Sequence, residues 1–503
     1  MNNGLGRITL AILVLAVVAG CAVAPPQSSP VPAAAFSESG QQCLEFFRRL
    51  DEAVARAGAG DGMTARLEGF PQLRINRFLA GYAQQPMSDA QFADWMGRLL
   101  ELGEEGRAVE LANLPAAETM RLERELRGFP GELQNAGEGV KRCGGYLNTA
   151  IFASAESRGG LRAAARVPDK YATWQRVAGL YWLARIPFAA GVRQWQKETR
   201  AMFETPLSQL PVRGRLLSYE PPRAEEAPVA ALIRNARVSA LGIPEFNGAE
   251  LDALFGAFAP AFVIDTASAA DRHGLLGWQD GALPAVDIAR PAVYRRVSYA
   301  RYQGRTLLQL NYSIWFPERP LVSEGDLLGG YLDGLTWRVT LTPDGEPWIY
   351  DSIHNCGCYH QFFPTARAAL IAQPDTLDET AFVPQALPKV APGERLSLRL
   401  ESGTHYLQRI VVERRAVSGA LQYGFADDDS LRSQAMSNGA RKSVFRADGV
   451  VPGTERGERY WFWPMGVPEA GAMRQWGRHA TAFVGRRHFD APDLLEKYFE
   501  MKP

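Results

Sequence analysis

Four side chains capable of metal binding or redox chemistry stand at every second position of one short stretch: His354, Cys356, Cys358 and His360. If this stretch is a strand, alternate side chains share one face, which would then present two imidazoles and two thiols. Two thiolates and two imidazoles are a recognised ligand set for zinc, and Cu(I) also favours thiolate. The pattern therefore suggests a transition-metal site for zinc or copper.

Geometry leaves two other interpretations open. A straight strand spreads four alternate residues over ~20 Å, whereas zinc ligands lie ~2 Å from one ion, so the chain would have to bend at Gly357. The two cysteines could instead form a strained redox pair, or the stretch could be a purely structural turn. A further metal ligand would come from Asp351, His405, His479 or His488.

Other catalytic patterns are missing from the sequence. It contains no G-x-S-x-G, S-x-x-K or H-E-x-x-H motif and no P-loop. The sequence therefore identifies no catalytic residue and no cofactor beyond zinc or copper, and it leaves open whether the protein is an enzyme. Basic and acidic residues both number 55, so the net charge is zero. This excludes the basic surplus typical of nucleic-acid-binding proteins.

The His/Cys stretch belongs to a part of the chain with the alternation of strands. Hydrophobic residues occupy every second position from Leu308 to Phe316, and Pro343-Asp344-Gly345-Glu346 is a strong turn pattern. We expect a mainly antiparallel β-rich domain over residues 261–503. Within it, the aromatic run 460–463 is expected to be a buried strand and residues 493–501 a short C-terminal helix.

The earlier part of the chain has helical spacing instead. Phe92, Trp95 and Leu99 recur at helical intervals, after a Ser88–Gln91 pattern typical of a helix N-cap. We expect an α-helical domain over residues 36–205, followed by a proline-punctuated transitional segment over 206–260. The fold class is therefore α+β, with the helical domain first.

Two cysteines lie in the helical third of the chain. Cys43 and Cys143 are expected to form a disulfide, because the N-terminus has the features of a secretion signal and disulfides persist in oxidising compartments. The bond would close a loop of about 100 residues. By restricting the unfolded chain, a loop of that length would raise the free energy of unfolding by roughly 4–5 kcal/mol. The bond would link two helices that are distant in the sequence.

The N-terminus has the features of a secretory signal peptide. Arg7 precedes an apolar run over residues 8–18 that is too short to cross a bilayer. The next residues, Val18-Ala19-Gly20-Cys21, resemble the lipobox of bacterial lipoproteins. The resemblance implies that residues 1–20 are removed and that Cys21 carries lipid on its sulfur and its new amino terminus. With Ala22 rather than Asp next, it also implies the outer membrane, facing the periplasm.

A tether rich in proline, serine and alanine follows over residues 21–35. The sequence thus predicts a cell-envelope protein attached to the membrane through lipid on Cys21, with no nucleic-acid partner. Its activity stays open between two classes. One is a metal-binding or thiol-redox protein acting through the His/Cys stretch, and the other is a non-catalytic scaffold that binds an envelope protein or cell-wall material.

Overall fold

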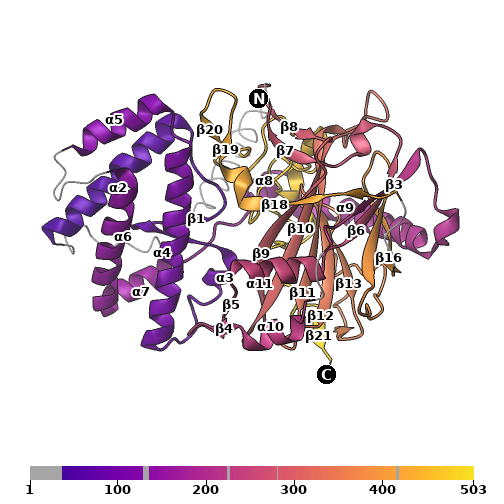
Figure 1. Ribbon diagram of the computed structural model, residues 1–503, viewed down its shortest axis with the longest axis horizontal. Coiled ribbons are helices and arrows are strands. Elements are labelled where there is room, and N and C mark those ends of the chain that lie inside the picture. The colour runs from indigo at the N-terminus through magenta and orange to yellow at the C-terminus, as the bar shows by residue number, and fades with distance from the viewer. Residues whose placement is uncertain (1–36, 128–134, 224–226, 280, 415–418, 503) are drawn as a thin grey trace, which may run out of the picture.

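The computed structural model describes residues 37–127, 135–223, 227–279, 281–414 and 419–502. The expected signal peptide, lipidated Cys21 and tether lie outside the described residues. Figure 1 shows the helices between residues 38 and 164 gathered on one side of the molecule and the later strands on the other, with the helices between residues 173 and 204 on the side of the strands. The α+β class is confirmed, with a helical region first and many antiparallel strands after it.

The helical region has two small cores. One is formed by α2, α5 and α6, and the other packs α4 against the β1–β2 hairpin. The predicted cap of α4 is present, since Ser88 and Gln91 bond each other's backbone N–H groups. The elements of this region are α2 (Glu38–Ala57), β1 (Ala65–Leu67), β2 (Phe70–Ile75), α3 (Arg77–Ala80), α4 (Asp89–Ala112), α5 (Ala116–Leu126), α6 (Ala136–Ala153), α7 (Ala155–Ala164), α8 (Thr173–Ala178) and α9 (Tyr181–Glu204).

The predicted disulfide is confirmed. Cys43 on α2 and Cys143 on α6 are bonded across 100 residues of sequence, with their Cα atoms 5.1 Å apart. Both cysteines are buried in the core shared by α2, α5 and α6. The bond therefore fixes two helices that already pack against each other.

A six-stranded sheet forms the centre of the later region, in the order β13-β12-β11-β10-β9-β18. All its neighbours are antiparallel except β18, which runs parallel to β9. The hairpin expected at Pro343-Asp344-Gly345-Glu346 joins β11 to β12, and a second hairpin joins β9 to β10 at Gly304. The strands are β9 (Ala292–Tyr302), β10 (Arg305–Arg319), β11 (Gly330–Leu341), β12 (Pro347–His354), β13 (Gln361–Pro364) and β18 (Gly424–Asp427).

A five-stranded sheet packs against the first, in the order β16-β15-β6-β3-β17. It mixes parallel and antiparallel neighbours, and it takes β3 from the expected transitional segment. The residues that alternate on β10, from Leu308 to Phe316, face the core between the two sheets as predicted. The strands are β3 (Arg215–Glu220), β6 (Ala261–Thr266), β15 (Arg395–Leu400), β16 (Leu407–Glu413) and β17 (Leu421–Gln422).

Short elements complete the described chain. The remaining helices are α10 (Val229–Asn235), α11 (Gly248–Ala257), α12 (Glu458–Trp461) and the 3-10 turns η2 (Leu207–Gln209), η3 (Ala269–Asp271), η4 (Asp428–Arg432) and η5 (Trp463–Met465). The remaining strands are β4 (Arg237–Val238), β5 (Pro244–Glu245), β7 (Leu275–Trp278), β8 (Pro284–Asp287), β14 (Ala368–Leu370), β19 (Gln434–Ala435), β20 (Arg441–Lys442) and β21 (Phe499–Met501).

Two local expectations differ from the structure. The aromatic run 460–463 is not a buried strand, because it belongs to the short helix α12 and the following turn, where Tyr460 and Trp461 are exposed. The structure does have a late short helix, α12, but the helix expected over residues 493–501 is not present. Residues 493–501 form turns and β21, which pairs with β14.

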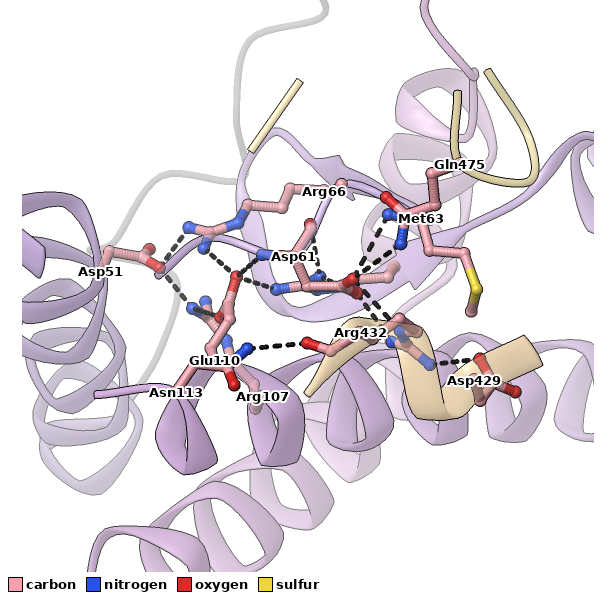
Figure 2. A network of polar contacts seen from close by, with 12 residues as sticks. Asp51, Asp61, Met63, Arg66, Arg107, Glu110, Asn113, Asp429, Arg432 and Gln475 are labelled. Carbon is pink, nitrogen blue, oxygen red and sulfur yellow. Dashed lines mark hydrogen bonds and ion pairs between the residues drawn. The ribbon is translucent and has the colours of Figure 1, made fainter. Parts of the chain in front are cut away.

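A buried ion-pair network joins the helical region to the β-rich region (Figure 2). Glu110 on α4 accepts hydrogen bonds from Arg74 at 2.5 Å and from Arg107 at 3.1 Å. Asp61 pairs with Arg432, which belongs to the β-rich region, at 2.7 Å. Because these groups are almost fully buried, each charge depends on its partners for solvation.

Candidate functional site

The His/Cys stretch is a turn rather than a strand. Strand β12 ends at His354, and β13 begins only at Gln361. The turn is closed by the N–H of His354 donating to the carbonyl of Cys358 at 3.0 Å and by the N–H of Gly357 donating to the carbonyl of His354 at 2.7 Å. The four predicted ligands therefore do not share one strand face.

Gly357 is the residue that makes this turn possible. Its φ is +95°, a conformation that L side chains rarely adopt. A Cβ at this position would lie 2.6 Å from the carbonyl oxygen of Ala480. The bend expected at Gly357 is present, but it serves close packing of the turn against the segment that contains Ala480.

Gly357→Ala is expected to lower the free energy of unfolding by about 1–3 kcal/mol, through both the positive φ and the backbone contact. Gly439→Ala is the matched control, because Gly439 has a φ of +79° with nothing near its Cβ position. The control should cost only about 1 kcal/mol. Urea unfolding followed by circular dichroism measures both, and equal losses would argue against the close contact with Ala480.

His354 points toward a buried chain of carboxylates and imidazoles. Its Nδ1 lies 3.5 Å from Asp333, and Asp333 lies 2.9 Å from Nδ1 of His405. The other nitrogen of His405 lies 3.5 Å from Asp271. Burial disfavours a charge on His405, but its hydrogen bonds to Asp271 and Asp333 outweigh burial and raise its pKa. Burial lowers the pKa of His354, which favours its neutral form.

His360 points to a different partner. Its Nε2 lies 2.9 Å from Asp351, which also accepts two hydrogen bonds from Arg338. Burial lowers the pKa of His360 to about 3, so this imidazole is neutral at physiological pH. Asp351 is thus committed to Arg338 and His360 rather than to a site at Cys356 and Cys358.

The two cysteines are buried and unbridged. They belong to an apolar cluster, in which the N–H of Cys358 donates to the sulfur of Cys356 at 3.4 Å. A hydrogen bond with Cys356, together with burial, raises the pKa of Cys358 well above its ordinary value. Burial and this contact therefore favour the thiol form of Cys358, whereas thiol–disulfide exchange needs the thiolate.

The structure does not assemble the expected metal site. Within the described ranges, no group of three or more His, Cys, Asp or Glu side chains is placed to hold a metal ion. His479 bonds the carbonyl of Asn355, and His488 lies 3.1 Å from Asp169, so neither adds a ligand. The positions of His354, Cys356, Cys358 and His360 therefore give the expected zinc or copper site no support.

The same turn instead forms one wall of an apolar pocket of about 560 Å³. This volume is in the range of small-molecule sites. Helix α9 and the segment around α12 form other walls. The lining residues are Pro187, Phe188, Gly191, Val192, Trp195, Gln196, Leu328, Gly357, Cys358, Tyr359, His360, Glu379, Thr380, Phe382, Tyr406, Glu458, Trp461, Phe462, Ala480, Thr481, Ala482, Phe483 and Arg487.

Polar groups form the smaller part of the pocket surface, and two of them are carboxyl groups in unusual environments. Burial raises the pKa of Glu458 to about 7, against the opposing charge of Arg456. Burial also raises the pKa of Glu379, whose Oε1 accepts hydrogen bonds from the N–H groups of Phe483 and Val484. The hydrogen bonds of Glu379 thus hold it in the wall of the pocket, whereas Glu458 has a carboxyl group that changes its charge near neutral pH.

Strained backbone accompanies the site. Tyr359, which lines the pocket, has a φ of 59°, and the ring of Tyr406 lies 4.6 Å from its own. His405, next to Tyr406, has a φ of 54°. Bulky residues rarely adopt such angles, and they concentrate at functional sites where the surrounding structure enforces them.

The sequence interpretation missed the pocket and Glu458. The signal that could have indicated them is the stretch 177–192, which contains Arg185 as its only charged residue. A helix that is apolar on all faces needs more than one apolar partner. Local spacing could not show which segments pack against this helix. The pocket joins segments up to 300 residues apart, from Pro187 to Arg487.

Comparisons with known proteins add no relative, since no family model, curated protein or solved structure matches the chain. None of the helices in the described part is long and apolar enough to span a membrane.

Proposed function

We propose that this chain is a lipid-anchored protein of the cell envelope that binds a small, mainly apolar molecule in the pocket beneath α9. The observation that carries the proposal is the pocket itself, whose walls are mostly aromatic and aliphatic side chains. Sites with such walls and a few placed polar groups are typical of small-molecule binding. Burial of the ligand's apolar surface would supply the affinity at roughly 25 cal/mol per Å².

The polar groups restrict the chemistry of the ligand. Because burial raises the pKa of Glu458 to about 7, its carboxyl is largely protonated in mildly acidic conditions and can donate a hydrogen bond. A neutral oxygen of the ligand is the matching acceptor. The thiol of Cys358, with its raised pKa, supports neither thiol-redox chemistry nor nucleophilic catalysis, so the proposed role is binding.

Gly191→Leu is the sharpest test, because Gly191 lines the pocket and a Cβ there meets nothing within 4 Å. The new side chain should fill the mouth of the pocket, and loss of a helix-interior glycine should stabilise α9 by about 0.5–1 kcal/mol. We expect the neutral fluorescent probe N-phenyl-1-naphthylamine to bind about tenfold more weakly or worse, which is about 1.4 kcal/mol.

Gly159→Leu is the matched control for this experiment. Gly159 lies inside α7, is also exposed, and also has nothing within 4 Å of a Cβ. This variant should keep the probe affinity of the parent protein. Parent protein that does not bind the probe, or equal binding by Gly191→Leu and Gly159→Leu, would refute the pocket as the binding site.

The proposed location in the cell envelope rests on the lipobox-like sequence that ends at Cys21. Stable anchoring needs more than one acyl chain, since each buried methylene contributes about 0.8 kcal/mol. Mass spectrometry of the protein from membrane fractions should find a chain that begins at Cys21 and carries diacylglycerol and a third acyl group. An intact, unmodified N-terminus at Met1 in a soluble fraction would contradict this part of the proposal.

A further inference from the structure

Eight large apolar side chains lie exposed on neighbouring elements beside the pocket, and we call this surface the apolar face. Such side chains are normally scattered on a protein surface, so a contiguous group indicates an interaction site. They come from α8, from the link between α8 and α9, from the start of α9 and from α12. The exposed fraction of each is at least 46%. They are Trp174, Val177, Leu180, Trp182, Leu183, Ile186, Tyr460 and Trp461.

The elements that carry the apolar face are rigidly packed together. Helix α8 and η5 are in contact, and the rings of Trp174 and Trp463 lie 5.6 Å apart. Phe188 on α9 packs against Phe462 at 5.3 Å between ring centroids. The hydroxyl of Tyr181 accepts a hydrogen bond from the N–H of Gly485 at 2.7 Å. The exposed side chains are therefore held outward by a fixed scaffold.

Leu180 shows that this exposure is enforced by the fold. It joins α8 to α9 with a φ of 50°, in the left-handed region where glycine or asparagine is the easier choice. Its side chain is nonetheless large, apolar and more than half exposed. A leucine that costs conformational energy and buries little surface in the free protein is explained if a partner covers it.

The apolar face continues into the mouth of the pocket. Trp461 belongs to both, and Pro187 and Phe188, which line the pocket, follow Ile186 directly on α9. Whatever covers the apolar face therefore also lies at the entrance of the pocket.

We infer that the apolar face docks on the surface of a lipid bilayer, an inference that rests on the lipid anchor of the proposed function. Trp174, Trp182, Tyr460 and Trp461 are the side-chain types that prefer the boundary between headgroups and acyl chains. Helices with an outward apolar side lie in that boundary without spanning it.

The position of the anchor favours a bilayer over a protein partner. Residues 22–36 separate Cys21 from the first described residue, and 15 residues reach at most about 50 Å. An anchored chain is thus always within reach of the membrane surface, which gives weak docking a high effective concentration. Arg459, which donates a hydrogen bond to the hydroxyl of Tyr460, suits anionic headgroups, whereas Arg185 and Arg486 are already paired with Asp378 and Asp169.

Docking in this orientation places the mouth of the pocket against the bilayer. An apolar ligand could then pass between the acyl chains and the pocket without crossing water, which avoids the cost of hydrating its apolar surface.

The test uses the full lipidated chain reconstituted in vesicles of phosphatidylethanolamine and phosphatidylglycerol, with and without brominated acyl chains. Bromine quenches tryptophan only at contact range, and Trp174, Trp182 and Trp461 are the exposed ones of the 11 tryptophans. We expect brominated vesicles to remove up to about a quarter of the emission, the share of these three residues. Identical emission in both vesicles would overturn the inference and would point to a protein partner.

A matched pair of variants leaves every fluorophore in place. Val177→Asp/Leu183→Asp puts two charges on the apolar face and should abolish most of the bromine quenching. Met120→Asp/Val238→Asp adds the same charges at exposed apolar positions on α5 and β4 and should change nothing. Equal quenching in the two variants would also overturn docking. Probe binding by Gly191→Leu is read separately, so the pocket and the docking surface can fail independently.

Discussion

Replacing Glu110 by alanine is expected to lower the free energy of unfolding by about 3–5 kcal/mol. Glu110 is fully buried between Arg74, Arg107 and Arg66, and these arginines hold its pKa at about 2 although burial opposes its charge. Removing the carboxylate leaves Arg74 and Arg107, each about 1% exposed, without their shared counter-charge. Uncompensated buried charge is among the costliest defects a substitution can create.

The matched control is Glu101→Ala, an exposed glutamate on the same helix, α4. It should change the free energy of unfolding by no more than about 0.5 kcal/mol. Urea unfolding followed by far- and near-ultraviolet circular dichroism measures both variants. Similar losses from Glu110→Ala and Glu101→Ala would mean that water or rearrangement solvates the arginines and that the network in Figure 2 contributes little.

The sheet was predictable where local pattern and tertiary burial agree. On β10, Leu308, Leu310 and Tyr312 alternate with residues whose side chains face away from this core. Because successive side chains of a strand point to opposite faces, the alternation produces one buried apolar face. Glycine-containing turns at Gly304 and Gly345 then fix the register of the hairpins, both with positive φ. The disulfide between Cys43 and Cys143 was predictable for another reason, since the predicted secretion signal implies an oxidising compartment.

The aromatic run 460–463 shows where composition misleads. Aromatic residues are common in strands because they usually pack on a half-buried sheet. Here Trp463 and Phe462 pack against α8 and α9, whereas Tyr460 and Trp461 remain exposed beside them. The run is visibly hydrophobic in the sequence, but the residues that it packs against are not. Those residues lie on helices almost 300 positions earlier in the chain.

The four side chains of the His/Cys stretch are not brought together, for a related physical reason. Alternation from His354 to His360 predicts a shared face only while the chain stays extended, and Gly357 ends that condition. Carboxylates on β11 and β12 then decide where the imidazoles point, since His354 lies beside Asp333 and His360 lies beside Asp351. The spacing of these residues does not show which carboxylate pairs with which imidazole, so the bend was predictable and its consequence for the ligands was not.

Glu458→Gln is expected to remove a pH dependence on the order of 3 kcal/mol from the stability of the protein. Burial raises the pKa of Glu458 from 4.5 to about 7, so between these pH values the folded protein holds a proton that the unfolded chain has released. The parent protein therefore has this stability in full below about pH 4.5 and loses it as the pH rises through about 7. A glutamine has the shape of the neutral acid and cannot ionise, so its contribution should not change with pH.

The measurement is the difference in unfolding free energy between parent and Glu458→Gln at pH 4.5 and pH 8. It should shift in favour of the variant at the higher pH, whereas the exposed Glu68→Gln control should show no such shift. The same proton should affect ligand binding, because an ionised carboxylate of Glu458 beside an apolar ligand would lose hydration without gaining a polar contact. Affinity for N-phenyl-1-naphthylamine should therefore fall above pH 7 in the parent protein and stay level in Glu458→Gln. Parallel pH profiles in the two proteins would place Glu458 away from the bound probe.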